Sequence, residues 1–332
     1  MGTVVIMGGG TGGAPAARSL RRKLGPEHRV IIIEKEKMPA NLAVLPLYAV
    51  GKKGRRQVFR NRSLLKRHGV ELIAGQVQKI DPAQKRVYTG QEEIGYDLLL
   101  IAAGAELDRS RPQGMAGAGF DLQSFAGVDE MRAALPHFQG TEIAIVVAST
   151  NIKCPGAPYE YALLLENWFY RQGRSRDISI TVYTPEKAPL IMFGEKTSGA
   201  IAELLLKRYI RVHPEAHVRL VDPGKKMIFL ENDSFPYDML LYYAAAAPPP
   251  FIRDSGLGGE EGWLKTDPHT MALQGLEDIY AVGDVTQVAT PSGEALPKLG
   301  GVAYLQSFVA AANMAGLLKG EKPGRAYSGF AA

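Results

Sequence analysis

The sequence contains a single cysteine, Cys154, among 332 residues. One cysteine excludes every intrachain disulfide, whether structural or redox-active, and it excludes a zinc site built from several cysteines. Histidine is also scarce, and Pro214 interrupts the one pair with helical metal-ligand spacing, His213 and His217. The sequence therefore predicts no metal site, and the scarcity of cysteine favours a reduced, cytoplasmic environment.

Long apolar runs are missing as well. The longest run, Met239 to Ile252, is interrupted by three consecutive prolines, whereas a membrane-spanning helix needs about 20 apolar residues. We therefore expect no transmembrane helix, and we expect no signal peptide because the chain opens directly on a strand pattern. Charge of one sign is only mildly in excess, at 39 Lys and Arg against 34 Asp and Glu, which does not by itself indicate nucleic acid. The composition is that of a globular protein with room for two domains.

A glycine-rich turn follows the first apolar segment. Thr3 to Met7 is typical of a strand buried on both faces, and Ala14 to Leu24 predicts a helix. Three glycines between them have the G-x-G-x-x-G spacing of dinucleotide-binding sites. The first allows the tight turn, the second allows backbone to approach a pyrophosphate, and the third lets the helix pack on the strand. These glycines are Gly8, Gly10 and Gly13, and Gly12 lies in the same turn.

The context of this turn supports a nucleotide site. A second buried strand, Arg29 to Ile33, ends in Glu34, 21 residues after Gly13. A carboxylate at this place accepts hydrogen bonds from a ribose 2′-OH and repels a 2′-phosphate. The start of the following helix offers free N–H groups to the phosphates. The sequence therefore predicts a dinucleotide site, the alternative being a glycine turn without a ligand.

The sequence repeats itself at an offset of 141 residues. Asp81-Pro82 and Asp222-Pro223 begin the two copies, and Tyr96-Asp97 and Tyr237-Asp238 end their hairpins. Each copy predicts a hairpin that leads into a buried strand. A repeat at this distance predicts two related βαβ domains rather than a solenoid.

The second copy lacks the glycines of the first. The same offset places Ser149, Asn151 and Cys154 at the three motif glycines, where side chains would obstruct a pyrophosphate. The second strand of this copy, Ile178 to Tyr183, ends without a carboxylate. We infer that the first unit binds a dinucleotide and that the second does not bind NAD(P)H in the usual way.

Two further segments complete the pattern of a known family. Residues 279–284 read IYAVGD and residues 101–104 read IAAG. With the glycine turn, they resemble the flavoprotein disulfide-reductase superfamily, in which an FAD domain carries an inserted domain of similar fold. The resemblance implies non-covalent FAD, an Asp284 that bonds the ribityl chain, and a Val77 that contacts adenine through its backbone. The cofactor-binding residues it implies are Gly8, Gly10, Gly12, Gly13, Glu34, Val77, Ala103, Gly104, Gly283, Asp284 and Lys298.

Within this superfamily, one branch is indicated by residues 153–158 (KCPGAP) and 296–300 (LPKLG). They resemble sulfide:quinone oxidoreductases and flavocytochrome c sulfide dehydrogenases. The resemblance implies that Cys154 and Lys298 are catalytic, with Cys154 a reactive thiol beside the flavin and Lys298 beneath its pyrimidine ring. A helix expected to begin near Ala157 would favour the thiolate. The alternatives are a small buried cysteine and a solvated surface lysine.

The chain departs from that branch in three ways. The quinone reductases use at least two cysteines, and only Cys154 exists here. Asn41 and Leu42 stand where the flavocytochromes attach flavin covalently, so attachment there is excluded. Only 48 residues follow Asp284, and one expected helix, Val302 to Lys319, fills much of them. We therefore expect a reduced or missing quinone pocket and membrane anchor.

A basic segment lies between Gly51 and Gly69 and contains no acidic residue. It is either a solvated helix face or a dock for anionic lipid or an acidic redox partner. No aromatic residues alternate with the basic ones in the manner typical of nucleic-acid binding. Its basic residues are Lys52, Lys53, Arg55, Arg56, Arg60, Arg62, Lys66 and Arg67.

The combined interpretation is an α/β fold with two Rossmann-like units. We expect an FAD-binding domain from residues 1–108 and 262–332, and an inserted domain from residues 109–261 that carries Cys154. The expected activity is oxidation of sulfide, a small thiol or a persulfide through Cys154, with electrons passing through FAD to quinone or another acceptor. Peripheral membrane contact and a homodimer are left open. The alternatives are a type II NADH dehydrogenase-like flavoprotein and a non-catalytic flavin-binding subunit.

Overall fold

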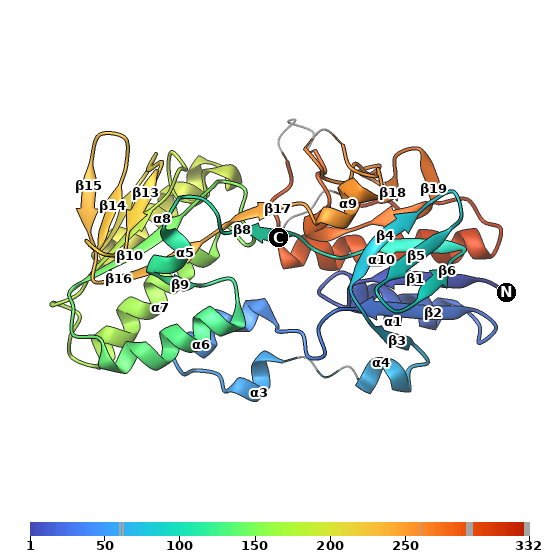
Figure 1. The fold of residues 1–332 in the computed structure, drawn as a ribbon, viewed down its shortest axis with the longest axis horizontal. Coiled ribbons are helices and arrows are strands. Elements are labelled where there is room, and N and C mark those ends of the chain that lie inside the picture. The colour runs from blue at the N-terminus through green and yellow to red at the C-terminus, as the bar shows by residue number, and fades with distance from the viewer. Residues whose placement is uncertain (60, 62, 260, 290–294, 329–332) are drawn as a thin grey trace. The chain divides into compact units, whose positions relative to one another are not determined.

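The computed structural model describes the chain except for residues 60, 62, 260, 290–294 and 329–332. The chain divides into two compact units, each built around a mostly parallel sheet (Figure 1). Strands β8 (Glu106–Asp108) and β17 (Ala245–Ala247) pair with each other where the chain passes between the units. Unit 1 comprises Met1–Pro39, Arg60–Glu106 and Ala247–Ala332, and unit 2 comprises Ala40–Phe59 and Leu107–Ala246.

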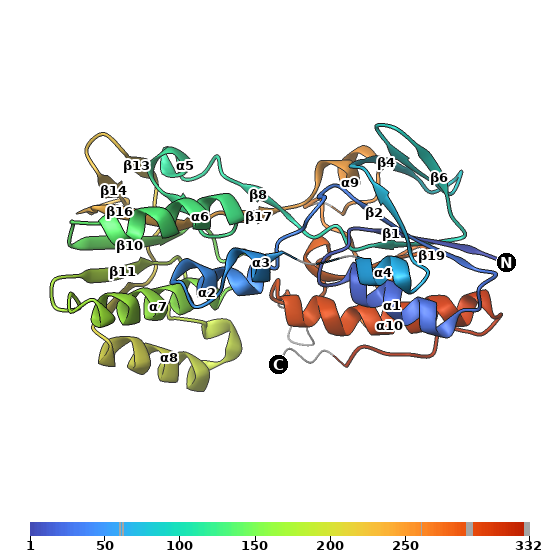
Figure 2. The same cartoon turned by 90° about the horizontal axis from the view of Figure 1, so that it is seen from below.

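Unit 1 has a six-stranded sheet in the order β18-β19-β7-β1-β2-β3, with β18 antiparallel and the others parallel. Its strands are apolar because both faces are covered. Val4 and Ile6 of β1 pack with helices α1 and α10, which lie side by side under the sheet in Figure 2. Val5 and Met7 pack on the other face, with β4, β5 and α9. The elements are β1 (Thr3–Met7), α1 (Gly13–Lys23), β2 (Arg29–Glu34), α4 (Ser63–Arg67), β3 (Glu71–Ala74), β4 (Val77–Asp81), β5 (Arg86–Thr89), β6 (Glu93–Gly95), β7 (Leu98–Ile101), α9 (Pro250–Asp254), β18 (Ala272–Leu273), β19 (Leu276–Ala281), η4 (Gly283–Val285) and α10 (Gly300–Leu318).

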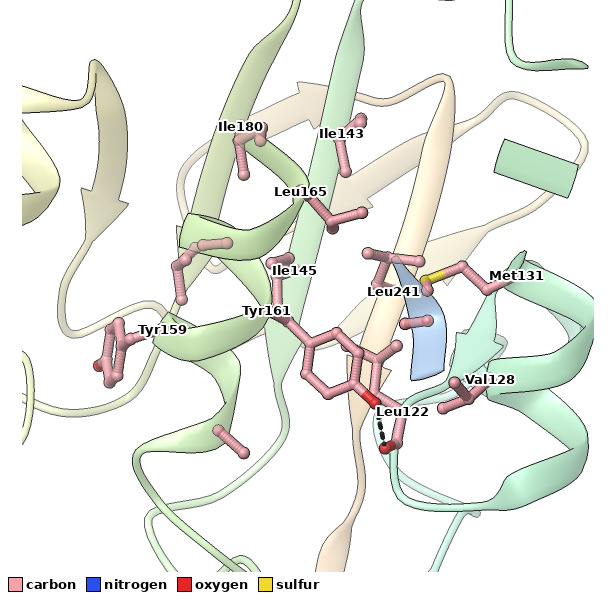
Figure 3. Packing of buried hydrophobic residues seen from close by; sticks show 14 of the residues in the cluster. Leu122, Val128, Met131, Ile143, Ile145, Tyr159, Tyr161, Leu165, Ile180 and Leu241 are labelled. Carbon is pink, nitrogen blue, oxygen red and sulfur yellow. Dashed lines mark hydrogen bonds between the residues drawn. The ribbon is translucent and has the colours of Figure 1, made fainter. Parts of the chain in front are cut away.

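Unit 2 has a five-stranded parallel sheet in the order β12-β11-β10-β16-β9. Tyr161 and Leu165 of α7 pack on Ile143, Ile145 and Leu241 of the central strands, as Figure 3 shows. The elements are η1 (Leu42–Val44), α2 (Leu45–Ala49), α3 (Arg55–Val58), α5 (Met115–Ala118), β9 (Phe120–Asp121), α6 (Phe125–Ala134), η2 (Leu135–His137), β10 (Glu142–Val147), α7 (Ala157–Arg171), β11 (Ser179–Tyr183), η3 (Ile191–Phe193), α8 (Glu195–Lys207), β12 (Ile210–His213), β13 (Leu220–Asp222), β14 (Met227–Phe229), β15 (Ser234–Pro236) and β16 (Met239–Tyr243).

The internal repeat is present in both units at the expected offset in the hairpins. Asp81 pairs with Arg86 across β4 and β5, and Asp222 pairs with Met227 across β13 and β14. The turns even share a left-handed lysine, since φ is 53° at Lys85 and 52° at Lys226, exactly 141 residues apart. The repeated sequence therefore folds into two copies of the same hairpin.

The offset changes to 139 residues at the first strand of each copy. Val4 pairs with Leu98 in unit 1, and Ile143 pairs with Met239 in unit 2. The predicted match of Ser149, Asn151 and Cys154 with the three glycines is therefore wrong. α1 begins six residues after Met7, whereas α7 begins eleven residues after the equivalent Val146, so unit 2 has a longer loop with no one-to-one counterpart of the glycine turn.

Two segments lie in a different unit from the predicted domain ranges. Residues 40–59 belong to unit 2, because Leu45 and Tyr48 of α2 pack in its core with Val128 and Met131 of α6. Residues 247–261 belong to unit 1, where Ile252 of α9 packs on the face of the sheet opposite to α1 and α10. In each segment a short helix packs its apolar side chains against the core of the unit to which the segment belongs.

Among the described residues, one helix has the length and composition to cross a membrane. Over 18 residues of α10 the mean hydropathy is 1.3, and 56% of that window is buried inside the protein. Buried Ser307 and Asn313 interrupt its apolar sequence, so the helix contains no long unbroken apolar run. Ala310 and Met314 pack in the core of unit 1, as in a core helix of a globular domain.

Candidate functional site

The glycine turn in unit 1 combines tight packing with open space. Gly8 has a φ of +91°, and a Cβ there would lie 2.5 Å from the carbonyl oxygen of Ala102. A Cβ on Gly13 would overlap the carbonyl oxygen of Gly8. At Gly10, in contrast, a Cβ would have no atom of the described residues within 4 Å. The turn therefore needs glycine at its first and third motif positions for its own packing, and it leaves room outside the second.

Glu34 ends β2 beside this turn. Its Oε2 accepts a hydrogen bond of 2.8 Å from the N–H of Gly9, and its Oε1 accepts one of 3.0 Å from the N–H of Glu36. The carboxylate is thus held at a fixed place and brings negative charge to the edge of the turn. This is the position at which a ribose hydroxyl is recognised in dinucleotide sites.

The other sequence motifs of unit 1 meet the glycine turn at the carboxyl ends of β1, β7 and β19. A Cβ on Gly8 would lie 3.2 Å from Cα of Ala103, and a Cβ on Gly12 would lie 3.0 Å from Val282. The N–H of Gly283 donates to Oε1 of Gln306 at 2.8 Å. Open α/β sheets bind their ligands at this edge. The predicted cofactor residues gathered here are Gly8, Gly10, Gly12, Gly13, Glu34, Ala103, Gly104, Gly283 and Asp284.

Val77 lies apart from this group, in the antiparallel sheet formed by β4, β5 and β6. It begins β4, three residues after the end of β3, and pairs with Thr89. Its half-buried side chain packs against the core of unit 1. Contact of its backbone with adenine stays a prediction.

Lys298 lies next to Asp284. Its Nζ donates to the carbonyl oxygens of Asp284 at 2.8 Å and of Thr286 at 3.4 Å, and it lies 3.5 Å from the centroid of the Trp263 ring. Helix α10 begins two residues later at Gly300, where a Cβ would lie 3.6 Å from Thr11 of the glycine turn. An ammonium group and a helix N-terminus therefore bring positive charge to the same edge. Sequence reasoning missed Trp263, which no motif marks.

Cys154 lies in unit 2, on the loop between β10 and α7. The cysteine is exposed and forms no disulfide. Its backbone has a left-handed φ of +56°, which is costly for a residue other than glycine and recurs at functional sites. Its carbonyl oxygen accepts the N–H of Ala157 at 2.9 Å, and Gly156 is the N-cap of α7. The thiol thus stands two residues before the helix cap, as predicted.

Glu160 is a second titratable group at this place, and sequence reasoning missed it. It lies in the first turn of α7. Although part of the residue reaches solvent, burial against the protein raises the pKa of its carboxyl group. Burial raises the pKa of Tyr161 and Tyr243 as well, with smaller contributions from Cys154 and Glu160. The Cys154 thiol and the Glu160 carboxyl group therefore act on the same two tyrosines. In the sequence, only the separation of six residues between Cys154 and Glu160 could have pointed to this carboxyl group.

The nucleotide edge of unit 2 is filled by the chain itself. Thr184 is the counterpart of Glu34, because Ile180 pairs with Ile143 as Val30 pairs with Val4. Two residues later, Glu186 accepts a hydrogen bond of 2.6 Å from the hydroxyl of Tyr159, whose exposed fraction is 2%.

Leu190 is the neighbour of the helix start in unit 2. Leu190, with a left-handed φ of +56°, places its Cδ1 4.0 Å from where a Cβ of Gly156 would be. Burial raises the pKa of the Glu186 carboxyl group, and the ionised form would repel a phosphate. Tyr159 and Glu186 thus bond to each other near the start of α7, with Leu190 close by, whereas no side chain of the described residues lies within 4 Å of a Cβ at Gly10 in unit 1.

The basic segment is divided between the two units. Arg55 binds Asp129 at 3.2 Å and lies over the Phe125 ring at 4.7 Å, so it is part of the packing of unit 2. Within the described parts of the chain, no group of three His, Cys, Asp or Glu residues has the geometry of a metal site. Lys52, Lys53, Arg55 and Arg56 lie in unit 2, Lys66 and Arg67 lie in unit 1, and Arg60 and Arg62 lie outside the described residues.

Comparison with known proteins agrees with this geometry. The model of the pyridine nucleotide-disulphide oxidoreductase family matches residues 2–315. The chain is 25% identical to a mitochondrial sulfide:quinone oxidoreductase of Mus musculus, over 98% of this chain and 74% of that protein. It is 21% identical to a type II NADH:quinone oxidoreductase of Staphylococcus aureus, over 96% of this chain and 83% of the relative.

A solved structure shows the same fold. The sulfide:quinone oxidoreductase of Aquifex aeolicus superposes with a TM-score of 0.87 at 21% identity, covering 96% of this chain and 78% of that chain. The α/β fold class and the resemblance to this superfamily, both predicted from the sequence, are confirmed.

Proposed function

Because the chain belongs to the pyridine nucleotide-disulphide oxidoreductase family, we propose that it is an FAD-dependent enzyme that oxidises sulfide, a small thiol or a persulfide through Cys154. Quinone or another acceptor then takes the electrons. One observation carries the proposal: the only thiol of the chain is exposed at the start of α7, in a unit whose own nucleotide edge is filled by Tyr159, Glu186 and Leu190.

The edge of unit 1 fits FAD. The open space outside Gly10, between two glycines that admit no side chain, suits a pyrophosphate held by the N–H groups at the start of α1. Glu34 would accept the ribose hydroxyls, and Asp284 the ribityl hydroxyls. When bound, FAD supplies a two-electron acceptor. Lys298 and the N-terminus of α10 would stabilise negative charge on it.

Cys154 would act as the sulfur-binding group. A helix N-terminus favours the thiolate, and Glu160, which lies in the first turn of the same helix and has a raised pKa, would exchange a proton with it. Joining hydrosulfide to the Cys154 thiol forms one S–S bond. This bond formation would release two electrons and one proton, for which bound FAD would be the acceptor, and the other hydrogen would stay on the terminal sulfur.

With one cysteine, the sulfur must leave on an external acceptor. A nucleophile such as a thiolate or sulfite would attack the outer sulfur of the Cys154 persulfide. The S–S bond then breaks, and its electron pair returns to Cys154 as the thiolate. A second protein cysteine, the usual means of retaining sulfur, does not exist in this sequence.

The test is an anaerobic sulfide titration of the FAD-loaded protein. We expect sulfide to bleach the oxidised-flavin absorbance of the wild type and to bleach the Cys154→Ser variant more slowly by about 100-fold or more, the scale at which a nucleophile contributes. Thr150→Ala changes an exposed residue of the same loop and should retain the wild-type rate. Bleaching of Cys154→Ser at the wild-type rate would contradict the proposal.

A second candidate is an NADH dehydrogenase of the type II sort. The likeness to type II NADH:quinone oxidoreductases favours it. The filled nucleotide edge of unit 2 argues against it, because NADH would have to displace Tyr159 and Leu190. Flavin reduction by NADH at a typical turnover of about 10 per second would support this candidate and displace the first.

A further inference from the structure

Trp263 belongs to no sequence motif, yet its ring lies directly against the ammonium group of Lys298. The Nζ atom of the lysine lies 3.5 Å from the centroid of the indole ring. The same Nζ donates to the carbonyl oxygens of Asp284 at 2.8 Å and Thr286 at 3.4 Å. The ammonium group thus contacts a π face and two carbonyl oxygens, all of which attract positive charge.

The indole is restrained by the backbone around it. Trp263 is buried, with an exposed fraction of 5%. Its carbonyl oxygen accepts the N–H of Gly259 at 3.0 Å. Gly262, the residue before it, has a φ of +78°, and a Cβ there would lie 2.9 Å from Pro248. A tight turn that requires glycine therefore precedes the indole and restricts its backbone.

The segment that carries the indole is bonded to the segment that supplies the carbonyl oxygens. Leu264, the next residue, forms a parallel bridge with Thr286, and its N–H donates to the carbonyl oxygen of Val285 at 3.2 Å. The N–H of Gln287 donates to the carbonyl oxygen of Leu264 at 3.0 Å. The indole and the two carbonyl oxygens are therefore parts of one hydrogen-bonded frame. A flexible lysine side chain that contacts this frame at the indole and at both carbonyls is restrained more than one that meets a single acceptor.

We propose that Trp263 is a positioning residue that holds the Lys298 ammonium group at the edge where the flavin is proposed to bind. The proposal rests on the proposed function and adds a residue that acts on the cofactor only through Lys298. A lysine side chain gains conformational entropy by swinging into solvent, and the indole face opposes this because it attracts the cation. The fixed ammonium group then lowers the free energy of reduced flavin, which carries negative charge.

The first test is the two-electron midpoint potential of the FAD-loaded protein, measured by anaerobic photochemical reduction against a reference dye. Trp263→Leu removes the π face, and we expect the equilibrium constant for flavin reduction to fall about 10-fold, which lowers the potential by about 30 mV. Trp263→Phe retains an aromatic face and should keep this constant within about 2-fold of the wild type. The control is Trp168→Leu, at the other tryptophan of the sequence, which should leave the potential unchanged.

A double variant separates positioning from packing. Lys298→Met should lower the equilibrium constant at least as far as Trp263→Leu, because it removes the ammonium group itself. Adding Trp263→Leu to Lys298→Met should then lower the constant no further, since the tryptophan acts only through the lysine. A further fall in the double variant, or a wild-type potential in Trp263→Leu, would overturn the proposal.

A second measurement reads the contact without FAD. The ε-methylene protons of a lysine that lies over an indole ring resonate at unusually high field, because the ring current shields them. We expect one such signal in the proton–carbon NMR spectrum of the FAD-free protein with isotope-labelled lysine. Lys298→Met and Trp263→Leu should both remove it, and Trp168→Leu should retain it. Its absence from the spectrum of the wild type contradicts the proposal even if Trp263→Leu folds poorly.

The two proposals fail separately. Photochemical reduction needs no sulfide, so the potentials of the variants stand even when sulfide fails to bleach the flavin, and that outcome removes only the proposed sulfide chemistry. Sulfide bleaching of the wild type, together with a wild-type potential in Trp263→Leu, removes only the positioning role of Trp263.

Discussion

At the scale of single residues, the two units differ at one equivalent strand end, which carries Glu34 in unit 1 and Thr184 in unit 2. Glu34 stands at the strand end of unit 1 and binds the glycine turn through Gly9. Thr184 stands at the equivalent place in unit 2, and the nearby carboxylate of Glu186 is bonded by Tyr159 from the same chain. The carboxylate of unit 1 is therefore bonded to the glycine turn, whereas that of unit 2 is bonded by a buried tyrosine.

Removing the Tyr159 hydroxyl should destabilise unit 2. Tyr159→Phe leaves the part-buried Glu186 without its 2.6 Å hydrogen bond, which costs about 1–3 kcal/mol of unfolding free energy. Urea unfolding of the variant and the wild type measures the difference. The control is Tyr170→Phe, at a tyrosine that is 64% exposed, which should leave the unfolding free energy unchanged. Equal effects of the two substitutions on the unfolding free energy would show that the Tyr159–Glu186 bond does not stabilise the fold.

Glu160 should make stability depend on pH. Burial raises its pKa above the ordinary value of 4.5 in the folded protein. The folded protein therefore binds this proton more tightly than the unfolded chain, and the resulting stabilisation is complete below pH 4.5 and is lost as the pH rises through the raised pKa. We expect the unfolding free energy of Glu160→Gln to fall less than that of the wild type between pH 4.5 and neutrality.

The control for this pH dependence is Glu203→Gln, on the exposed face of α8 beside Lys207. It should retain the wild-type dependence of unfolding free energy on pH. If Glu160→Gln shows the same slope as the wild type, the Glu160 carboxyl group does not sit in the environment described.

At the scale of elements, the β1–turn–α1 segment contains two glycines that its own packing requires and a third, Gly10, that we propose serves binding. Gly8 and Gly13 face backbone carbonyls at distances that admit no Cβ, whereas Gly10 faces open space. Within one G-x-G-x-x-G pattern, two glycines are thus needed because a side chain would clash with backbone, and one leaves space outside the turn.

Alanine substitutions at Gly10 and at Gly8 should have different effects on FAD binding and on stability. Gly10→Ala should keep the wild-type unfolding free energy without FAD and should bind FAD about 10-fold or more weakly, because the new methyl group stands where the pyrophosphate is proposed to lie. Gly8→Ala, with a φ of +91° and a clash with Ala102, should lose stability with or without FAD. Wild-type FAD affinity in Gly10→Ala would show that the turn does not hold the cofactor.

The elements also show how far the sequence could lead. Buried strands such as Thr3–Met7, and the hairpin of residues 81–97 with its repeat, were predictable because their patterns are local. The equivalence of Cys154 with a motif glycine was wrong, since a loop of different length leaves no local trace. The pairing of Glu186 with Tyr159 depends on long-range packing that one sequence does not display.

At the scale of the whole molecule, the duplicated fold divides the tasks of a redox protein. Unit 1 offers a glycine turn, the carboxylate of Glu34 and positive charge near Asp284 for one dinucleotide. Unit 2 keeps the same sheet order around β10 but fills its nucleotide edge, and its longer loop carries Cys154. The second copy thus carries a thiol on the loop that follows its first strand, where the first copy has its glycine turn.

The most direct measurement of this account compares two donors on one anaerobic sample of the FAD-loaded protein. The absorbance of oxidised flavin is followed by stopped flow after mixing with sulfide and, separately, with NADH at equal concentration. The account predicts rapid bleaching by sulfide and none by NADH on the time scale of turnover. Rapid bleaching by NADH with no response to sulfide would contradict it.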